Sequence, residues 1–130
     1  MDFQLFCEEL NIFLTDRFKY KRNYAYVTPQ KNIAATTKRF QLYIRLTPCK
    51  YFWPQNTITI ARIGFYETRK GHCTELLKFI LKIAPDYMHI GIENTTDNSA
   101  LFAEKLGFSI YKDAHYIIKT DILKNRLFIK

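Results

Sequence analysis

One continuous stretch constrains the fold of this chain more than any other. A run of apolar and β-branched residues from Thr57 to about Phe65 predicts a strand, and it leads into the loop Thr68-Arg69-Lys70-Gly71-His72-Cys73-Thr74 and a helical pattern. A helix that begins in such a loop presents unpaired backbone N–H groups and the positive end of its dipole. Arg69 and Lys70 add charge, and Gly71 lets an anion approach the backbone closely. The stretch therefore predicts an anion site, with a plain solvated turn as the alternative.

A second stretch further along the chain reads Asn98-Ser99-Ala100-Leu101-Phe102-Ala103-Glu104-Lys105-Leu106-Gly107-Phe108. It predicts a short helix that ends at Gly107, a residue suited to the left-handed position after a helix. The order and separation of the two stretches resemble the signature segments of the GNAT-superfamily N-acetyltransferases. Those enzymes bind the pyrophosphate of acetyl-coenzyme A on a Gln/Arg-x-x-Gly-x-Gly/Ala loop, and a later helix ends in a Lys-Leu-Gly-Phe-like run. The resemblance extends from Thr57 to Lys119.

Length and composition indicate one globular domain over residues 1–130. Hydrophobic residues make up 48% and aromatic residues 16% of the chain, which excludes a disordered protein. No apolar run is long enough to span a membrane, and the acidic, amphipathic start is unlike a signal peptide. Cys7, Cys49 and Cys73 are odd in number and far apart, so they fit neither a disulfide framework nor a zinc site. These features predict a cytoplasmic protein with no membrane partner and no metal.

The net charge of +8 attracts polyanions: nucleic acid, an acidic membrane surface, or a phosphorylated ligand such as coenzyme A. A solubilising surface is the alternative. Part of the excess is clustered between Arg17 and Tyr24, where basic and aromatic residues are interleaved, and between Lys119 and Lys130. Such mixtures bind single-stranded nucleic acid through stacking and phosphate contacts, but they also occur where a helix meets a strand. Nucleic acid is therefore one candidate partner.

Hydrophobic periodicity predicts the element order α-β-β-β-α-β-α-β-β. The predicted helices run from Asp2 to about Asp16, from His72 to Ile83, and from Asp97 or Asn98 to Gly107. The predicted strands cover residues 24–27, 38–47, 57–65 and 88–92, followed by a pair at Ile110 and 115–119. A break in the alternation near Ala61 indicates a bulge. The resemblance implies an α/β (α+β) class: a GNAT-like mixed, mostly antiparallel sheet flanked by helices on both sides, with the family's N-terminal strand and one helix missing or reduced.

The resemblance implies that acetyl-coenzyme A is bound as a cosubstrate. Family members hold the pantetheine arm on the strand before the loop, which here means Arg62, Ile63 and Gly64. The pyrophosphate would sit on the N–H groups of the loop and helix start, namely Arg69, Lys70, Gly71, His72, Cys73 and Thr74. Asn98 and Ser99 would contact the far side of coenzyme A. Thr68 replaces the usual Gln/Arg and Cys73 the usual Gly/Ala, so this chain departs from the family pattern at two positions.

Acetyl transfer to an amine needs a base for the ammonium and an acid for the departing thiolate. Many family members use a tyrosine four residues before the Gly of Gly-Phe as that acid, and this chain has Ala103 there. Glu93 is the predicted base, directly or through water, because it ends the strand where the family's sheet opens for the amine. Tyr111 is the predicted substitute acid, and Tyr116 is a second tyrosine that could reach the thioester side from the last strands. Structural roles are the alternative for each: a solvated strand-end carboxylate for Glu93, and core residues with the hydroxyl at the rim for the tyrosines.

Other titratable groups near the predicted site have simpler explanations. Glu67 is a further candidate base, but its place at the loop entrance predicts that it faces solvent. His72 is expected to face the phosphate or solvent, and His89 to be a structural histidine. A Cys73 thiolate at a helix start would have a lowered pKa and could act as a nucleophile, but no paired base accompanies it.

Three functions are consistent with these residues. The first is an N-acetyltransferase that moves an acetyl group from acetyl-coenzyme A to an amine, with an acidic or nucleic-acid-associated acceptor favoured by the basic charge. The second is a catalytically inactive GNAT-fold protein that binds nucleic acid or a protein partner. The third is a coenzyme-A-binding domain with a regulatory or structural role. The loop from Pro48 to Asn56, with Tyr51, Phe52 and Trp53, is expected to line an acceptor pocket, shield a dimer interface or pack as a lid.

Overall fold

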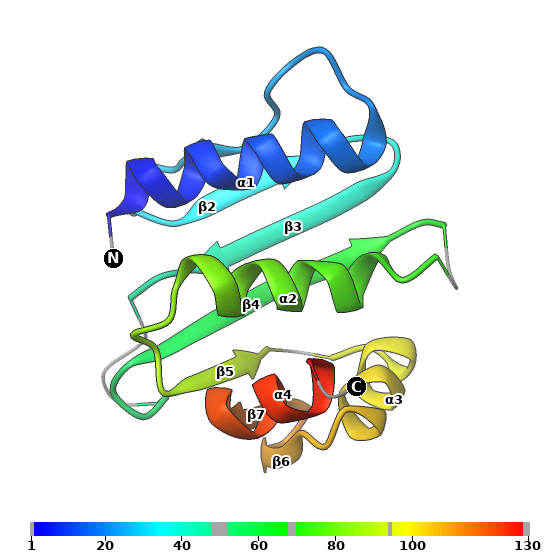
Figure 1. Cartoon of the computed structure of the whole chain (residues 1–130). Helices are drawn as coiled ribbons and strands as arrows, with labels where there is room; N and C mark the ends of the chain where they lie inside the picture. The colour runs from blue at the N-terminus through cyan, green and yellow to red at the C-terminus, as the bar shows by residue number, and fades with distance from the viewer. Residues whose placement is uncertain (1, 48–51, 68–69, 94, 129–130) are drawn as a thin grey trace.

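The computed structural model describes residues 2–47, 52–67, 70–93 and 95–128, which form one seven-stranded sheet and four helices (Figure 1). The helices are α1 (Phe3–Phe18), α2 (His72–Ile83), α3 (Asp97–Lys105) and α4 (Thr120–Leu127). The strands are β1 (Tyr26–Val27), β2 (Ile33–Thr36), β3 (Phe40–Arg45), β4 (Thr57–Phe65), β5 (His89–Ile92), β6 (Ser109–Lys112) and β7 (His115–Lys119). Their order in the sheet is β1-β2-β3-β4-β5-β7-β6, and only β4 and β5 run parallel. The prediction of a mixed, mostly antiparallel sheet with helices is confirmed.

Two elements are absent from the predicted order. Strand β2 has the sequence Ile-Ala-Ala-Thr, and its first three residues are all buried, so it lacks the alternation that identifies a strand. It is held in the sheet by its two neighbours, β1 and β3. Helix α4 buries only Leu123, and its many polar and basic residues resemble a solvated tail. The order is therefore α-β-β-β-β-α-β-α-β-β-α.

The predicted boundaries of the central elements agree closely with the structure. Strand β4 and helix α2 begin and end as predicted, and β4 carries the predicted bulge. Helix α1 is capped by the Asp2 carboxylate, which accepts from the N–H groups of Gln4 and Leu5. Helix α3 is capped one residue earlier than predicted, by Thr96 in a reciprocal capping box with Ser99.

The helices do not cover both faces of the sheet evenly. Figure 1 shows α1 and α2 side by side on one face, and α4 packs against α2. Their apolar residues and the strand residues beneath them, among them Phe40, Ile44, Ile60 and Ile92, form one buried core. The opposite face carries the segment 52–56 instead of a helix, and its Trp53 packs on Gly91 of β5. Helix α3 lies on the same face as α2, because its Glu104 reaches Tyr116, the cross-strand partner of the core residue Ile92. The expectation of helices on both sides is therefore wrong for the described residues.

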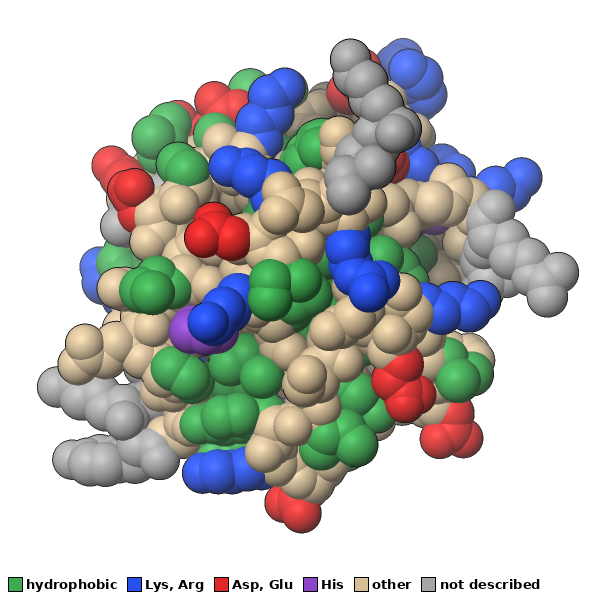
Figure 2. Space-filling model, turned by 60° about the horizontal axis from the view of Figure 1, so that its bottom comes forward, with side chains coloured by type: hydrophobic (Ala, Val, Ile, Leu, Met, Phe, Trp, Pro, Cys, Tyr) green, Lys and Arg blue, Asp and Glu red, His purple; other side chains and the backbone are tan. Residues whose placement is uncertain are grey.

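Hydrophobic side chains reach the surface around the edge strand β6. Figure 2 shows this end of the molecule, where hydrophobic and basic side chains lie beside one another. Ile110 on β6 is 65% exposed and Ile122 on α4 is 49% exposed. The exposed Lys112 on β6 supplies the kind of charge that opposes edge-to-edge pairing of strands. Within the described residues, no helix combines the length and the hydropathy needed to cross a membrane.

Candidate functional site

The two parallel strands β4 and β5 part from each other inside the molecule. They pair only from Thr57–Ile60 on β4 and His89–Ile92 on β5, and a last hydrogen bond runs from the Glu93 N–H to the Ile60 carbonyl. Beyond that point β4 continues to Phe65 and pairs with β3 alone, while the chain after β5 turns away into α3. The β4 edge that faces the gap therefore has no strand partner among the described residues. Unpaired backbone groups on such an edge are available to an extended ligand.

A bulge in β4 lies where the strands part. Ile60 pairs with Ile44 and Arg62 with Tyr43 on β3, so Ala61 is an extra residue without a cross-strand partner. The predicted pantetheine-binding residues follow it directly: Arg62 is exposed, whereas Ile63 and Gly64 are half-buried. A Cβ built on Gly64 would meet nothing closer than the Gln41 carbonyl oxygen at 3.9 Å. Gly64 is therefore not required by packing within the protein.

Helix α2 begins just beyond the end of β4, and its N-terminus is bare. Gly71 is the N-cap residue in the left-handed conformation, with φ 75°, and it has no side chain with which to cap the helix. Helices α1 and α3, by contrast, have side-chain caps. The first-turn N–H groups of α2 therefore have no side-chain cap, and the anion site expected on the N–H groups of Arg69 to Thr74 stays a prediction. Thr68 and Arg69, which belong to the same prediction, lie outside the described residues.

The loop before α2 is fixed to α1 by one arginine. Arg17 donates from Nε to Nδ1 of His72 at 2.7 Å and from a terminal nitrogen to the Lys70 carbonyl at 2.9 Å. The His72 ring lies 4.6 Å from the Phe18 ring and 5.3 Å from the Phe65 ring, centroid to centroid. Burial, reinforced by the Arg17 guanidinium, lowers the pKa of His72, so the ring is neutral at pH 7. The expectation of an exposed or phosphate-facing His72 side chain is wrong, because the ring is buried and positions the loop.

Glu67, the alternative base, belongs to a surface ion pair. Its carboxylate accepts a hydrogen bond from Arg39, which also lies over the Phe18 ring. This hydrogen bond lowers the pKa of Glu67 below its usual range. A solvated, arginine-bound carboxylate is a weak base, and the prediction that Glu67 faces solvent is confirmed by its 44% side-chain exposure.

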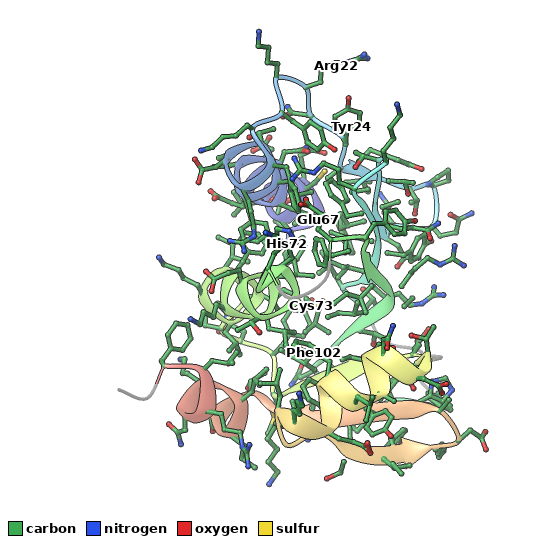
Figure 3. The ribbon with its side chains drawn as sticks, turned by 90° about the vertical axis from the view of Figure 1, so that its right-hand side faces the viewer. Arg22, Tyr24, Glu67, His72, Cys73 and Phe102 are labelled. Carbon is green, nitrogen blue, oxygen red and sulfur yellow. The ribbon has the colours of Figure 1, made fainter. Side chains whose placement is uncertain are left out.

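Cys73 is the second residue of α2. Figure 3 shows Glu67, His72, Cys73 and Phe102 following one another from the loop after β4, past the start of α2, to α3. Burial raises the pKa of the Cys73 thiol to about 11. The thiol is therefore protonated at pH 7, and the hypothesis of a nucleophilic thiolate is not supported.

We expect Cys73 to react slowly with alkylating reagents. At pH 8, about one Cys73 thiol in a thousand would be ionised, against roughly a quarter of ordinary thiols, so the expected rate is about 250-fold lower. Timed iodoacetamide labelling, followed by mass spectrometry of the Cys73 peptide, measures this rate against a free cysteine peptide. Labelling as fast as the free peptide would show that the thiolate is stabilised after all.

The opposite face of the sheet contains an open cavity of about 680 Å³. It lies beside the end of β5 and is lined by Gln30, Asn32, Arg45, Thr47, Phe52, Glu93 and His115. Cavities of this size accommodate small organic ligands. The predicted base, Glu93, is part of its wall.

Glu93 is held in place by two side chains. Its Oε2 accepts a hydrogen bond from Nε1 of Trp53 at 3.0 Å, and its Oε1 lies 3.5 Å from Nε of Arg45. The Glu93 side chain is 16% exposed, so it is not the freely solvated carboxylate of the alternative interpretation. Trp53 in turn occupies the space above Gly91, where a Cβ would come within 2.7 Å of its ring carbons.

Tyr111, the predicted acid, joins the same cluster. Its ring stacks on Trp53 with the centroids 4.9 Å apart, and its hydroxyl donates to the Phe52 carbonyl. Trp53 thus brings Glu93 and Tyr111 together from distant parts of the chain. The hydroxyl proton of Tyr111, however, is already donated to the Phe52 carbonyl. Tyr116 lies elsewhere, with its hydroxyl 3.5 Å from Glu104, and burial, reinforced by that carboxylate, raises the pKa of Tyr116.

Helix α3 offers fewer free polar side chains to a ligand than predicted. Ser99 bonds through its hydroxyl to the Thr96 backbone, so its side chain serves the capping box. Asn98 is exposed at the start of the helix. Ala103, at the position of the family's tyrosine, is fully buried. A catalytic hydroxyl is therefore absent from that position.

The sequence analysis did not identify the residues whose side chains hold His72 and Glu93 in place. Arg17, Arg45 and Gly91 were not singled out, and Trp53 was considered only as part of an aromatic loop. Their partners lie far away in sequence, 55 residues for the Arg17–His72 pair and 40 for the Trp53–Glu93 pair. No local pattern reports such pairs, although a lone tryptophan in a loop is a signal of burial.

Comparison with models of protein families gives no match to this chain. Comparison with curated protein sequences gives no match either.

The contact between Gly91 and Trp53 leads to a specific prediction. A Gly91→Ala variant is expected to lose about 1–3 kcal/mol of unfolding free energy, because the added methyl group displaces the Trp53 ring. Trp53 is the sole tryptophan of the chain, so a red shift of its emission reports the displacement directly. Gly64→Ala is the matched control, because a Cβ has room there. Equal denaturation curves and emission spectra for the parent and Gly91→Ala would contradict this contact.

Proposed function

We propose that this protein is an N-acetyltransferase of the GNAT type, which transfers an acetyl group from acetyl-coenzyme A to an amine. The proposal depends chiefly on one observation: parallel strands that part at a bulge, with a bare helix start beyond the end of the longer strand. An extended pantetheine arm can hydrogen-bond to the unpaired β4 edge after Ile60. The pyrophosphate can then bind the first-turn N–H groups of α2, next to Lys70 and Gly71.

The arrangement supports a simple reaction. The acceptor amine enters through the cavity, and Glu93 removes the ammonium proton directly or through one water. The neutral nitrogen attacks the thioester carbonyl carbon, and the tetrahedral intermediate loses the second nitrogen proton to water. The C–S bond then breaks, and coenzyme A leaves as a thiolate. Tyr111 remains the candidate side-chain acid, although its hydroxyl already donates to Phe52. Water is the simpler proton source, because an alkyl thiol has a pKa of about 8.5 and its thiolate leaves readily.

Calorimetric titration with acetyl-coenzyme A tests the proposal. We expect saturable binding at a single site, followed by release of coenzyme A when an acceptor is added. Desulfo-coenzyme A is a suitable second ligand, because it presents the same pyrophosphate without a thioester. A well-folded protein that binds neither compound would exclude the transferase.

A second candidate function is nucleic-acid binding by a GNAT-fold protein without transferase activity. Two observations favour it: Ala103 replaces the family's tyrosine, and basic residues surround the loop before α2. Lys19, Lys21 and Arg22 are exposed after α1, and the Tyr20–Thr37 hydrogen bond brings that loop next to Lys38 and Arg39. Affinity for labelled single-stranded RNA that falls steeply with salt, without binding of acetyl-coenzyme A, would favour this function. Acetyl-coenzyme A binding without turnover or RNA affinity would favour a regulatory coenzyme-A-binding domain.

A further inference from the structure

The cavity wall holds a positive and a negative side chain next to each other. Arg45 comes from β3 and Glu93 from the end of β5, and both line the same open space. Their contact is a single one, from Nε of Arg45 to Oε1 of Glu93 at 3.5 Å. This distance is longer than the N–O distances in a strong pair, in which two parallel N–H groups of arginine bind one carboxylate.

Most of the hydrogen-bonding capacity of Arg45 is unused. The planar guanidinium has five N–H donors in a fixed fork. Among the described residues, Arg45 has only the contact with Glu93 and a position 5.3 Å from the centre of the Tyr43 ring. The Arg45 side chain is 39% exposed. Its terminal nitrogens are therefore free, within the described part of the chain, to receive an anionic group.

We propose that the acceptor amine is an α-amino acid, whose ammonium group binds Glu93 and whose carboxylate binds Arg45. This inference rests on the proposed transferase function, and it names the acceptor class for that function. Arg45 is then the residue that selects amines with a neighbouring carboxylate. Simple amines, which lack the carboxylate, would leave Arg45 without that partner.

The spacing of the charges supports this assignment. In an α-amino acid the nitrogen and the carboxylate carbon are about 2.5 Å apart, since both are bonded to the same Cα atom. Oε1 of Glu93 lies 3.5 Å from Nε of Arg45, so the carboxylate and the guanidinium are close enough for one small zwitterion to reach both. Two such ion pairs, each charge-assisted, replace one loose contact.

The cavity also has room for an amino-acid side chain. Its volume of about 680 Å³ exceeds what the charged groups alone would fill. The rings of Phe52 and His115 lie edge to face in its wall with centroids 4.8 Å apart, and Gln30 and Asn32 line it as well. The wall thus offers both apolar and polar contacts to a side chain.

Direct binding of amino acids separates this inference from the transferase proposal. The protein without acetyl-coenzyme A is screened by saturation-transfer NMR against the proteinogenic L-amino acids. The best ligand is then titrated beside its C-terminal amide and beside its decarboxylated amine. We expect the amino acid to bind at least about tenfold more tightly than either analogue that lacks the carboxylate, because a charge-assisted hydrogen-bonded pair has that effect.

Charge-neutral variants locate the binding residue. Arg45→Gln is expected to bring the affinity ratio between amino acid and amide close to one. Arg22→Gln, an exposed arginine in the loop after α1, removes the same charge and should preserve the ratio. The assignment is overturned if no amino acid binds, if the amide binds as well as the acid, or if Arg45→Gln weakens both ligands equally. A preference for phosphoethanolamine over every amino acid would also overturn it.

The same data distinguish the two proposals. Failure to bind acetyl-coenzyme A in a protein that discriminates amino acid from amide would remove the transferase function and keep the α-amino-acid site. Acetyl-coenzyme A binding without that discrimination would keep the transferase and remove the site.

Discussion

A Gly71→Glu variant is expected to lose at least about 100-fold in affinity for acetyl-coenzyme A. The added carboxylate would stand at the bare start of α2, where the pyrophosphate is proposed to bind. Two like charges about 5 Å apart repel by about 3 kcal/mol at the effective dielectric constant of a protein surface, which corresponds to about 100-fold in affinity. Calorimetric titration of the parent and the variant measures the loss.

The control must separate charge from backbone strain. Gly71 has a φ of 75°, so any L-residue there adds strain of about 1–2 kcal/mol. Gly71→Gln has the same size and strain as Gly71→Glu but carries no charge. Circular dichroism and thermal unfolding establish that both variants are folded. Equal affinities of the two variants would attribute the effect to strain, and unchanged binding in Gly71→Glu would remove the anion site from the start of α2.

The central part of the fold could be predicted because its signals are local. The strand, loop and helix from Thr57 to Ile83 have strong periodicity and clear ends, and the bulge at Ala61 is visible as a break in alternation. Strand β2 could not be predicted, since its alanines have no strand preference and are held by pairing on both sides. The formation of α4 similarly depends on tertiary packing, because this short polar helix is held against the core by one buried leucine, Leu123.

The candidate site was predictable only in part. Gly71 and Glu93 could be placed, because one depends on loop chemistry and the other on the end of a strand. The environment of Glu93 depends on Trp53 and Arg45, which reach it from separate parts of the chain. The prediction for the His72 side chain was wrong for the same reason, since its burial is decided by Arg17 and Phe18 on α1.

A Glu93→Gln variant is expected to lower kcat/KM for the amine acceptor by about 10²–10⁴-fold, the usual contribution of general base catalysis. Glutamine has the same size, and its amide oxygen can still accept the hydrogen bond from Nε1 of Trp53. It cannot take a proton from the ammonium group. The rate of coenzyme A release, followed with a thiol reagent at saturating acetyl-coenzyme A, measures the loss.

Two further measurements show whether the loss in kcat/KM comes from the missing base or from a change in structure. Acetyl-coenzyme A affinity should be unchanged, because Glu93 lies on the cavity side of the sheet and away from the start of α2. Trp53 emission should also match the parent, because the hydrogen bond to residue 93 is retained. If the variant keeps the parent's kcat/KM, then Glu93 only anchors Trp53 and Arg45, and the proton leaves the amine by another route.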